Sequence, residues 1–407
     1  MSIDGADTAW ILVSAALVML MTPALGLFYG GLVRQGNVLS TIMHSFFILA
    51  LISVQWVLFG YSLAFGPDVN GLIGGLDYVG LQGVGQTPGP YSDTVPHLAF
   101  MAFQMTFAVI TPALISGAFA ERKRFAAFAL FSLLWATLVY DPVCHWVWGG
   151  GWLSELGALD FAGGTVVHIT SGVSALVCAL VLGRRRGMEN GPPEPHNVTM
   201  TVLGASLLWF GWFGFNAGSA LAADGLAAHA FVTTHVAASA AALTWVLVGW
   251  FRSGHPSVLG AAIGAVAGLV AITPAAGFVT PMAALVIGAL AGVSCFFVSE
   301  WMRGHVDDAL DVFGVHGVGG ALGALATGFV ATTAVNPAGA DGLLYGGTTL
   351  PLIQLGAVAA VALYAALMTW GILKLVHAVV PIRVGEEDED AGLDMSQHGE
   401  AGYRLNG

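Results

Sequence analysis

Charge is scarce in this sequence of 407 residues, because Asp, Glu, Lys and Arg together make up only 9% of it. No soluble fold has so little charge beside so much apolar surface. Cysteine is scarce as well, and Cys144, Cys178 and Cys295 show neither paired nor metal-ligand spacing. We therefore expect no disulfide framework and no metal site, and we interpret the cysteines as small apolar residues.

Apolar residues make up 57% of the chain, and 56 residues are glycine. Several apolar runs exceed the roughly 20 residues that a spanning helix needs, and glycine lets such helices pack closely. We predict an all-α polytopic membrane protein with eleven transmembrane helices. The predicted spans are Thr8–Tyr29, Leu39–Phe65, His97–Phe119, Phe125–Val147, Phe161–Leu182, Val198–Ala217, Leu226–Phe251, Val258–Ala276, Phe278–Glu300, Asp308–Thr332 and Leu350–Val380.

The twelve Lys and Arg residues test this number of spans. They occur in every second connection and near the C-terminal end, whereas the N-terminus and the alternate loops carry none. The positive-inside rule then places the C-terminus in the cytoplasm and the N-terminus outside, which requires an odd number of spans. The first eight residues carry no positive charge, so we expect the first span to be retained rather than cleaved as a signal peptide.

The longest internal cytoplasmic loop divides the chain, since five spans precede it and five follow before the last helix. An odd-numbered half that is repeated must enter the membrane upside down, and such repeats usually hold the substrate at their interface. The predicted units are a first five-helix repeat at 1–182, a connecting loop at 183–197, a second, inverted repeat at 198–332, an outer loop and eleventh helix at 333–380, and an acidic cytoplasmic tail at 381–407.

The tail carries a large part of the net charge of −12. Two interpretations of it stay open. Its composition is typical of a solvated disordered segment. Alternatively, it is a docking element, because Leu393, Met395 and Tyr403 give it apolar surface to bury.

Two histidines lie inside apolar runs. His168 follows Asp160 in the fifth span and His316 follows Asp311 in the tenth, each roughly 12 Å from its end of the membrane. A single such histidine is ordinarily a packed residue bonded to a backbone carbonyl. Two at matched depth in inverted halves favour a meeting near the centre of a pore. There a neutral pair would share one proton and titrate as a unit.

The acid before the first of these histidines has three possible roles. Asp160 can bind a cation directly, act on it from a distance, or cap the fifth helix by accepting from the amides of Gly163 or Gly164. We favour a cap whose charge also attracts a cation above it. Capping is likewise the ordinary interpretation of the acids at the start of the tenth span, Asp307, Asp308 and Asp311.

Aromatic residues gather at the outer side. Trp148 follows an outer helix end, Phe103 and Phe107 lie one turn apart in the third span, and Ser219 closes the sixth. An aromatic belt at the membrane surface is the ordinary interpretation. Aromatic faces also bind cations, however, and the outer loops carry acids but no competing Lys or Arg. A small cation is the expected guest.

Five stretches resemble the ammonium transporter (Amt) family of the Amt/methylammonium permease/Rh superfamily, in its bacterial type. They are Thr22–Gly31, His145–Gly151, Ala158–Ile169, Gly211–Ser219 and Asp311–Gly320. The resemblance implies one central pore in each protomer of a homotrimer in the plasma (inner) membrane. It implies ammonium or ammonia as the substrate, and leaves methylammonium open as a second one.

The resemblance also implies roles for single residues. By it, Phe107, Trp148 and Ser219 form the outer ammonium site with Phe103 beside them, and Phe107 and Phe215 form a stacked gate below. His168 and His316 match the twin-histidine pair, and Asp160 matches an acid needed for conduction. The family's cytoplasmic partner is a PII-type signalling protein, and 392–403 is similar to the family's regulatory segment. No nucleic acid or cofactor is expected.

The expected mechanism follows from desolvation, because a bare ammonium ion in a dry pore faces a cost of order 20 kcal/mol in the idealised limit. We expect ammonium to be selected outside and to lose its proton, so that ammonia passes the histidines while the proton is relayed inward. Two alternatives remain: a channel for neutral gas, as in Rh proteins, and an ammonium sensor that signals through its tail. An enzyme is not expected, since no nucleophile–base pair appears.

Overall fold

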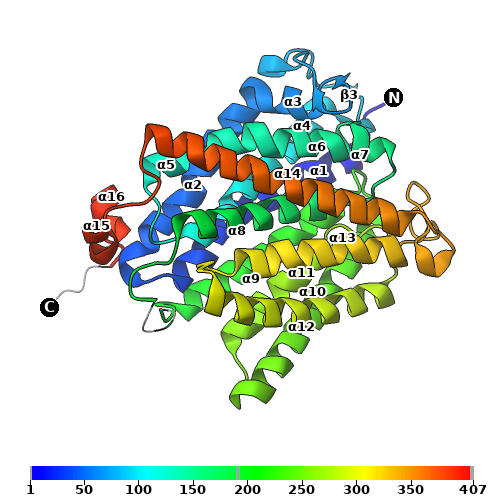
Figure 1. The fold of residues 1–407 in the computed structure, drawn as a ribbon. Coiled ribbons are helices and arrows are strands. Elements are labelled where there is room, and N and C mark those ends of the chain that lie inside the picture. Colours follow the sequence, from blue (N-terminus) through cyan, green and yellow to red (C-terminus); the bar gives the residue numbers. More distant parts are fainter. Residues whose placement is uncertain (1, 189–190, 192, 404–407) are drawn as a thin grey trace.

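The computed structural model describes residues 2–188, 191 and 193–403. Helices dominate it and run side by side through the whole molecule (Figure 1). Within the described residues, ten helical segments are long and apolar enough to cross a membrane, and the apolar helix α11 (Val258–Ile272) is shorter. The predicted class of polytopic helical membrane protein is confirmed. The predicted number of eleven crossings stays a prediction, because α11 ends before the predicted limit at Ala276.

The first half of the chain holds the elements up to the arginine-rich loop. They are α1 (Gly5–Leu32), η1 (Gln35–Asn37), α2 (Val38–Gln55), η2 (Trp56–Gly60), α3 (Tyr61–Phe65), α4 (His97–Ile115), η4 (Ser116–Phe119), α5 (Phe125–Trp135), η5 (Ala136–Tyr140), α6 (Asp141–Trp148), α7 (Trp152–Glu155), η6 (Gly164–Ile169) and α8 (Thr170–Leu182). The loop before α4 folds into two small antiparallel hairpins with a short 3-10 turn between them. These elements are β1 (Asp68–Val69), β2 (Ile73–Gly74), η3 (Val79–Leu81), β3 (Pro88–Gly89) and β4 (Ser92–Pro96).

The second half of the chain ends in the tail. Its elements are α9 (Val198–Gly218), α10 (Gly225–Ser253), α11, α12 (Pro281–His305), η8 (Phe313–Gly317), α13 (Val318–Val330), η9 (Leu343–Tyr345), α14 (Leu350–Val379), α15 (Glu386–Ala391) and α16 (Leu393–His398). The helix pairs pack closely because glycines lie between them. A Cβ on Gly204 of α9, for example, would stand 2.3 Å from the backbone nitrogen of Phe28 on α1.

Four of the helical segments, η2, η5, η6 and η8, are single π-helical stretches within longer helices. The sequence predicts uninterrupted helices here, because apolar periodicity does not reveal a local widening of the helix. Such π-helical stretches occur frequently at functional sites. Two of them, η6 and η8, contain His168 and His316.

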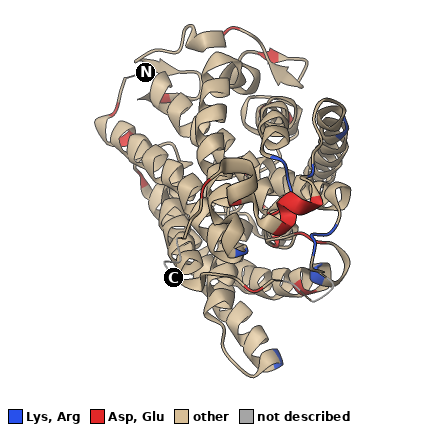
Figure 2. Cartoon of the chain, turned by 90° about the vertical axis from the view of Figure 1, so that its left-hand side faces the viewer, with Lys and Arg blue, Asp and Glu red and all other residues tan. Residues whose placement is uncertain are grey.

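Charged residues lie mostly at helix ends and in connections, and long stretches of helix carry none (Figure 2). One end holds a buried polar network. Glu121 accepts from Arg185 at 2.8 Å and from Arg34 at 3.2 Å, and Asp307 accepts from Arg185 and Arg122. Burial acts to raise the pKa of Glu121 and of Asp307, but these arginines more than offset it and hold both pKa values below the ordinary range.

The tail folds back against this end of the molecule (Figure 1). Asp394 accepts from the backbone amides of Leu39 and Ser40 at the start of α2, and Glu389 accepts from Arg383 and from the backbone of Arg186. The interpretation as a disordered segment is therefore wrong for residues 381–403. Of the three apolar residues expected to be buried, Leu393 is buried, but Met395 stays 59% exposed and Tyr403 is partly exposed.

Candidate functional site

Two histidines meet in the interior of the molecule. The Nδ1 atoms of His168 and His316 lie 3.2 Å apart, so one ring donates a hydrogen bond and the other accepts it. Both side chains are buried, and the Nε2 atom of His168 has no hydrogen-bond partner among the described residues. The pair thus joins two distant parts of the chain and keeps one polar ring atom available.

Small residues bring the two histidine-bearing helices together. A Cβ on Gly172 of α8 would stand 2.1 Å from the backbone nitrogen of Gly317, and one on Gly320 would stand 2.9 Å from the Cβ of His168. Neither glycine can carry a larger side chain without moving a helix. Gly172 and Gly320 are the residues four positions after each histidine, where the sequence predicts close packing.

Asp160 lies at the start of η6, at the side of the molecule that we call outer after the orientation that the sequence predicts. Its carboxylate is fully bonded. Its carboxylate accepts from the amides of Gly163 and Gly164, as the capping interpretation expects, and also from those of Thr165 and Val166, at 2.7 to 3.1 Å. Its backbone oxygen accepts from the indole Nε1 of Trp148 at 2.9 Å. One residue therefore fixes both the helix that holds His168 and the largest aromatic ring of the outer site.

An outer cavity of about 290 Å³ lies beside this indole. Trp148 and Ser219 line it, together with Gln104 of α4. The hydroxyl of Ser219 donates to the backbone oxygen of Phe215, which leaves its lone pairs as acceptors, and the buried Oε1 of Gln104 has no partner among the described residues. Sequence reasoning missed Gln104, because a glutamine one residue after Phe103 gives no signal of its own.

One of the predicted aromatic residues, Trp148, lines the outer cavity, and the others pack behind or below it. Phe107 lies with its ring edge-on to Trp148, 5.8 Å between centroids, and its ring centroid is 4.2 Å from that of Phe215. Of the predicted site residues, Trp148 and Ser219 line the outer cavity, whereas Phe107 and Phe103 do not: both are buried, and their rings pack against each other at 5.0 Å. The two rings Phe107 and Phe215 thus lie between the outer cavity and the histidines.

Below these two rings the space narrows. A cavity of only about 10 Å³ is bordered by Phe215, His168 and His316, together with Trp212. Trp212 stacks on His168 with 5.4 Å between centroids, and its Nε1 donates to Thr273 at 2.9 Å. Sequence reasoning missed Trp212 because its neighbours in the Gly211–Ser219 stretch are also aromatic.

A third cavity, of about 290 Å³, lies beneath His316 and is bordered by Asp311 and Arg303. The acids before His316 take three different partners. Asp308 accepts from the amide of Phe313 at the start of η8, whereas Asp311 pairs with Arg303 and Asp307 belongs to the polar network. Asp308, eight residues before His316, therefore caps η8 in the way that Asp160 caps η6, whereas the side chain of Asp311, which the sequence comparison used, pairs with Arg303 instead.

The described residues contain no group of three His, Cys, Asp or Glu side chains that could hold a metal ion. What the arrangement offers is a path: an outer cavity with acceptors and aromatic rings, two stacked rings, a tight passage along a histidine pair, and an inner cavity. Fold and site together define a polytopic membrane protein with a narrow internal passage for a very small solute.

Comparisons with known proteins show the family to which this membrane protein belongs. The Ammonium Transporter Family matches residues 9–403, and this chain belongs to it. An ammonium transporter from Bacillus subtilis is 57% identical over 400 residues, which cover 98% of each chain. The crystal structure of Saccharomyces cerevisiae Mep2 is 37% identical and superimposes with a TM-score of 0.90 over 99% of this chain and 92% of that one. A solved structure described as a sensor Amt protein is 27% identical, with a TM-score of 0.87 over 97% and 98%.

Proposed function

We propose that this transporter recruits ammonium at the outer cavity, that ammonium then loses a proton, and that ammonia passes the histidine pair while the proton is relayed inward. The observation that carries the proposal is the buried contact between His168 and His316 directly below two stacked aromatic rings. A proton-sharing pair is of use only to a solute that gains and loses a proton.

Selection of the cation takes place at the outer cavity. The face of the Trp148 indole attracts a cation, and Ser219 and Gln104 offer oxygen acceptors to its N–H groups. A desolvated cation–π contact contributes about 2 kcal/mol. Potassium is similar in charge but donates no hydrogen bonds, so these acceptors favour ammonium over it.

Passage then requires a neutral solute. The rings of Phe107 and Phe215 and the cavity of about 10 Å³ beneath them leave no room for a hydration shell. Among the residues that the structure describes, no carboxylate borders that cavity, so an ion would lose its water without compensation. Ammonia can instead exchange hydrogen bonds with the Nε2 of His168, and the histidine pair or nearby water carries the proton.

The remaining family properties are part of the same proposal. We place two inverted five-helix repeats at 1–182 and 198–332, the N-terminus outside, the C-terminus in the cytoplasm, and the protein in the plasma membrane as a homotrimer. The exposed apolar side chains on α10 and α12 support this proposal, because such a surface must contact either another protomer or lipid. A PII-type protein would act on the face formed by the arginine loop and the docked tail.

Transport current on proteoliposomes under an inward ammonium gradient tests the mechanism. We expect a saturable current that falls at least tenfold in His168→Ala and several-fold in Trp148→Leu, because the relay and the cation site are then lost. Trp301→Leu removes an exposed tryptophan that borders none of the three cavities of the passage and serves as the matched control. Ammonia flux without any current in the parent protein would refute proton relay and favour the neutral-gas channel.

Sensing is the second candidate function, and the likeness to the solved sensor Amt protein favours it. The two functions differ in one observable. A sensor that does not conduct would bind ammonium at the outer cavity and change the tail's protection from hydrogen exchange, yet it would carry no current in the same proteoliposomes.

A further inference from the structure

The turn that follows Trp148 is covered by the first hairpin of the loop before α4. Trp148 is the last residue of α6, and the glycine turn 149–151 leads from it to α7. The hairpin, residues 68–74, contacts α6 directly, because the indole of Trp146 donates to the backbone oxygen of Leu72 at 2.8 Å. None of the hairpin residues, all of which are described, lines the outer cavity, so the proposed mechanism of transport does not use them.

One carboxylate joins the hairpin to α6. Asp68, the first residue of β1, accepts from the ring Nε2 of His145 at 2.8 Å and from the amide of Gly71 at 2.9 Å. The Nδ1 of His145 lies 2.9 Å from the backbone oxygen of Ala64, which can only accept. Both ring nitrogens therefore donate, so a buried imidazolium is paired with a carboxylate whose side chain is 40% exposed. The hydrogen bonds from His145 and Gly71 hold the pKa of Asp68 below its ordinary value, which keeps the carboxylate charged.

The backbone of His145 shapes the glycine turn. Its carbonyl oxygen accepts from the amide of Gly149 at 3.0 Å and from that of Gly151 at 2.9 Å. These amides directly follow Trp148, so a shift of His145 moves the backbone from which the indole extends. The ring and the carbonyl oxygen of one residue therefore connect the hairpin to the turn.

A second connection lies after the turn. The backbone oxygen of Gly71, whose amide bonds to Asp68, accepts from the amide of Trp152 at 3.0 Å. Gly71 adopts a φ of 73°, a left-handed conformation that glycine favours. A Cβ on Gly151 would stand 2.8 Å from the same oxygen, so the hairpin and the turn are in close contact. Asp68 is thus connected to the chain on both sides of Trp148.

We propose that Asp68 is a positioning residue of the outer site, which fixes the indole of Trp148 by holding both sides of its turn. The inference rests on the proposed recruitment of ammonium at this ring. A cation–π contact depends on how the ring face is placed, so a turn with more freedom should bind ammonium less tightly. The later steps should not change, because Asp68 borders none of the three cavities of the passage.

Two variants separate the position of the ring from the charge of Asp68, because a negative charge near the mouth would also attract a cation. Asp68→Ala removes the charge and both hydrogen bonds. Asp68→Asn removes the charge alone, since its amide N–H can donate to the Nε2 of a neutral His145 while its oxygen accepts from Gly71. Asp68→Ser keeps an acceptor for Gly71 but is too short to reach His145.

Transport current in the same proteoliposomes, measured against ammonium concentration, tests the inference. We expect the half-maximal concentration to rise roughly five- to tenfold in Asp68→Ala, from partial loss of the cation–π contact, with the maximal current unchanged. Asp68→Asn should stay within about twofold of the parent, and Asp68→Ser should lie between the two. Hydrogen exchange of residues 145–152 is a second readout, which should be faster in Asp68→Ala than in Asp68→Asn.

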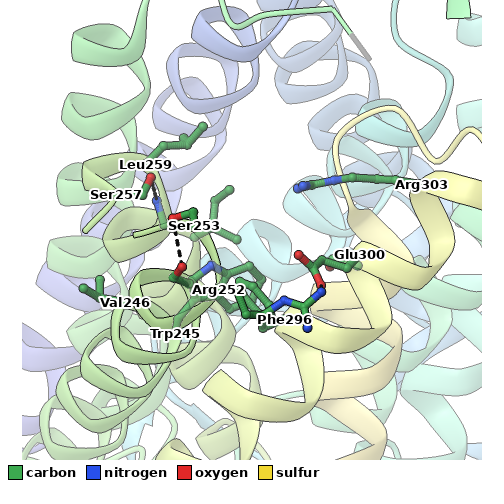
Figure 3. A pocket seen from close by; sticks show the side chains of 13 residues that line it. Trp245, Val246, Arg252, Ser253, Ser257, Leu259, Phe296, Glu300 and Arg303 are labelled. Carbon is green, nitrogen blue, oxygen red and sulfur yellow. Dashed lines mark hydrogen bonds and ion pairs between the residues drawn. The ribbon is translucent and has the colours of Figure 1, made fainter. Parts of the chain in front are cut away.

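Glu300→Gln is the matched control. Glu300 on α12 is 37% exposed and pairs with Arg252 on α10 at 3.0 Å, in a cleft between α10, α11 and α12 (Figure 3). It therefore shares the exposure of Asp68 and a cationic partner from another element, but it borders none of the cavities of the passage. The half-maximal concentration and the exchange of residues 145–152 should both stay at the parent values.

Trp148→Leu separates this inference from the function on which it rests. If Trp148→Leu raises the half-maximal concentration and Asp68→Ala does not, the positioning role of Asp68 is overturned and the recruitment site stands. An equal rise in Asp68→Ala and Asp68→Asn would also overturn that role, because charge would then explain the effect. If Trp148→Leu leaves the half-maximal concentration unchanged, the recruitment site is wrong and the inference is overturned with it.

Discussion

At the scale of single residues, the site depends on side chains that satisfy several partners at once. The carboxylate of Asp160 accepts from four backbone amides while its backbone oxygen holds the indole of Trp148. Sequence alone predicts that Asp160 is a cap. It cannot predict the bond to Trp148, because that bond depends on how α6 ends relative to η6.

Asp160→Ala should therefore be both less stable and inactive. Four buried amides would lose their acceptor at about 1 kcal/mol or more each, so we expect a loss on the order of 3–5 kcal/mol, with Asp160→Asn intermediate. Thermal unfolding in detergent and transport current measure the two effects. Glu155→Ala, an exposed acid at the same end, is the control. An Asp160→Ala protein that melts like the parent would contradict the capping role.

At the scale of elements, two helices are brought into contact by glycine. The sequence contains this information, since small residues follow each histidine at helical spacing, and the structure places Gly172 against Gly317. The π-helical form of η6 and η8 was not predictable, because an extra residue in one turn changes neither hydropathy nor period appreciably. The sequence also could not show that Asp308, rather than Asp311, accepts a hydrogen bond from the start of η8.

Gly172→Ala tests this contact. The added Cβ would stand 2.1 Å from the nitrogen of Gly317, so α8 and η8 must separate and the histidine pair must lengthen beyond its 3.2 Å. We expect the current to fall at least tenfold. Gly356→Ala on α14, where nothing lies within 4 Å of the added atom, should transport normally and gain up to about 1 kcal/mol from helix propensity. Normal current in Gly172→Ala would show that the close approach is not required.

The tail is held by a second contact between elements. Asp394 caps α2 through the amides of Leu39 and Ser40, so Asp394→Ala should cost about 1 kcal/mol or more and release α16. Hydrogen exchange of residues 386–398 measures the release. Glu387→Ala, an exposed acid of α15, should leave exchange unchanged. Equal protection in both variants would mean that Asp394 does not anchor the tail.

At the scale of the whole molecule, the two ends differ in charge. The arginines at one end let the sequence predict the orientation, but sequence does not reveal that two of them, Arg122 and Arg185, are buried in ion pairs. Glu121 comes two residues after the third predicted span, and its position gives no sign that it accepts from Arg34 and Arg185 of two other connections. Such a network depends on the assembled fold, because its members are far apart in the sequence.

The network makes stability depend on pH in a defined direction. Burial alone would raise the pKa of Glu121, but Arg185 and Arg34 hold it below its ordinary value, so the native state favours the ionised form. A carboxylate whose pKa is lowered in the folded protein stabilises the fold at pH values above its ordinary pKa, near 4. This stability is lost as the pH falls through the lowered pKa of the folded protein. Glu121→Gln should therefore unfold more easily at pH 7, by about 1–3 kcal/mol, and the difference from the parent should shrink as the pH falls below the ordinary carboxylate range near pH 4. Thermal unfolding between pH 3 and 8 measures both curves, with Glu387→Gln as the exposed control. Parallel curves across that range would place the stabilising charge elsewhere than Glu121.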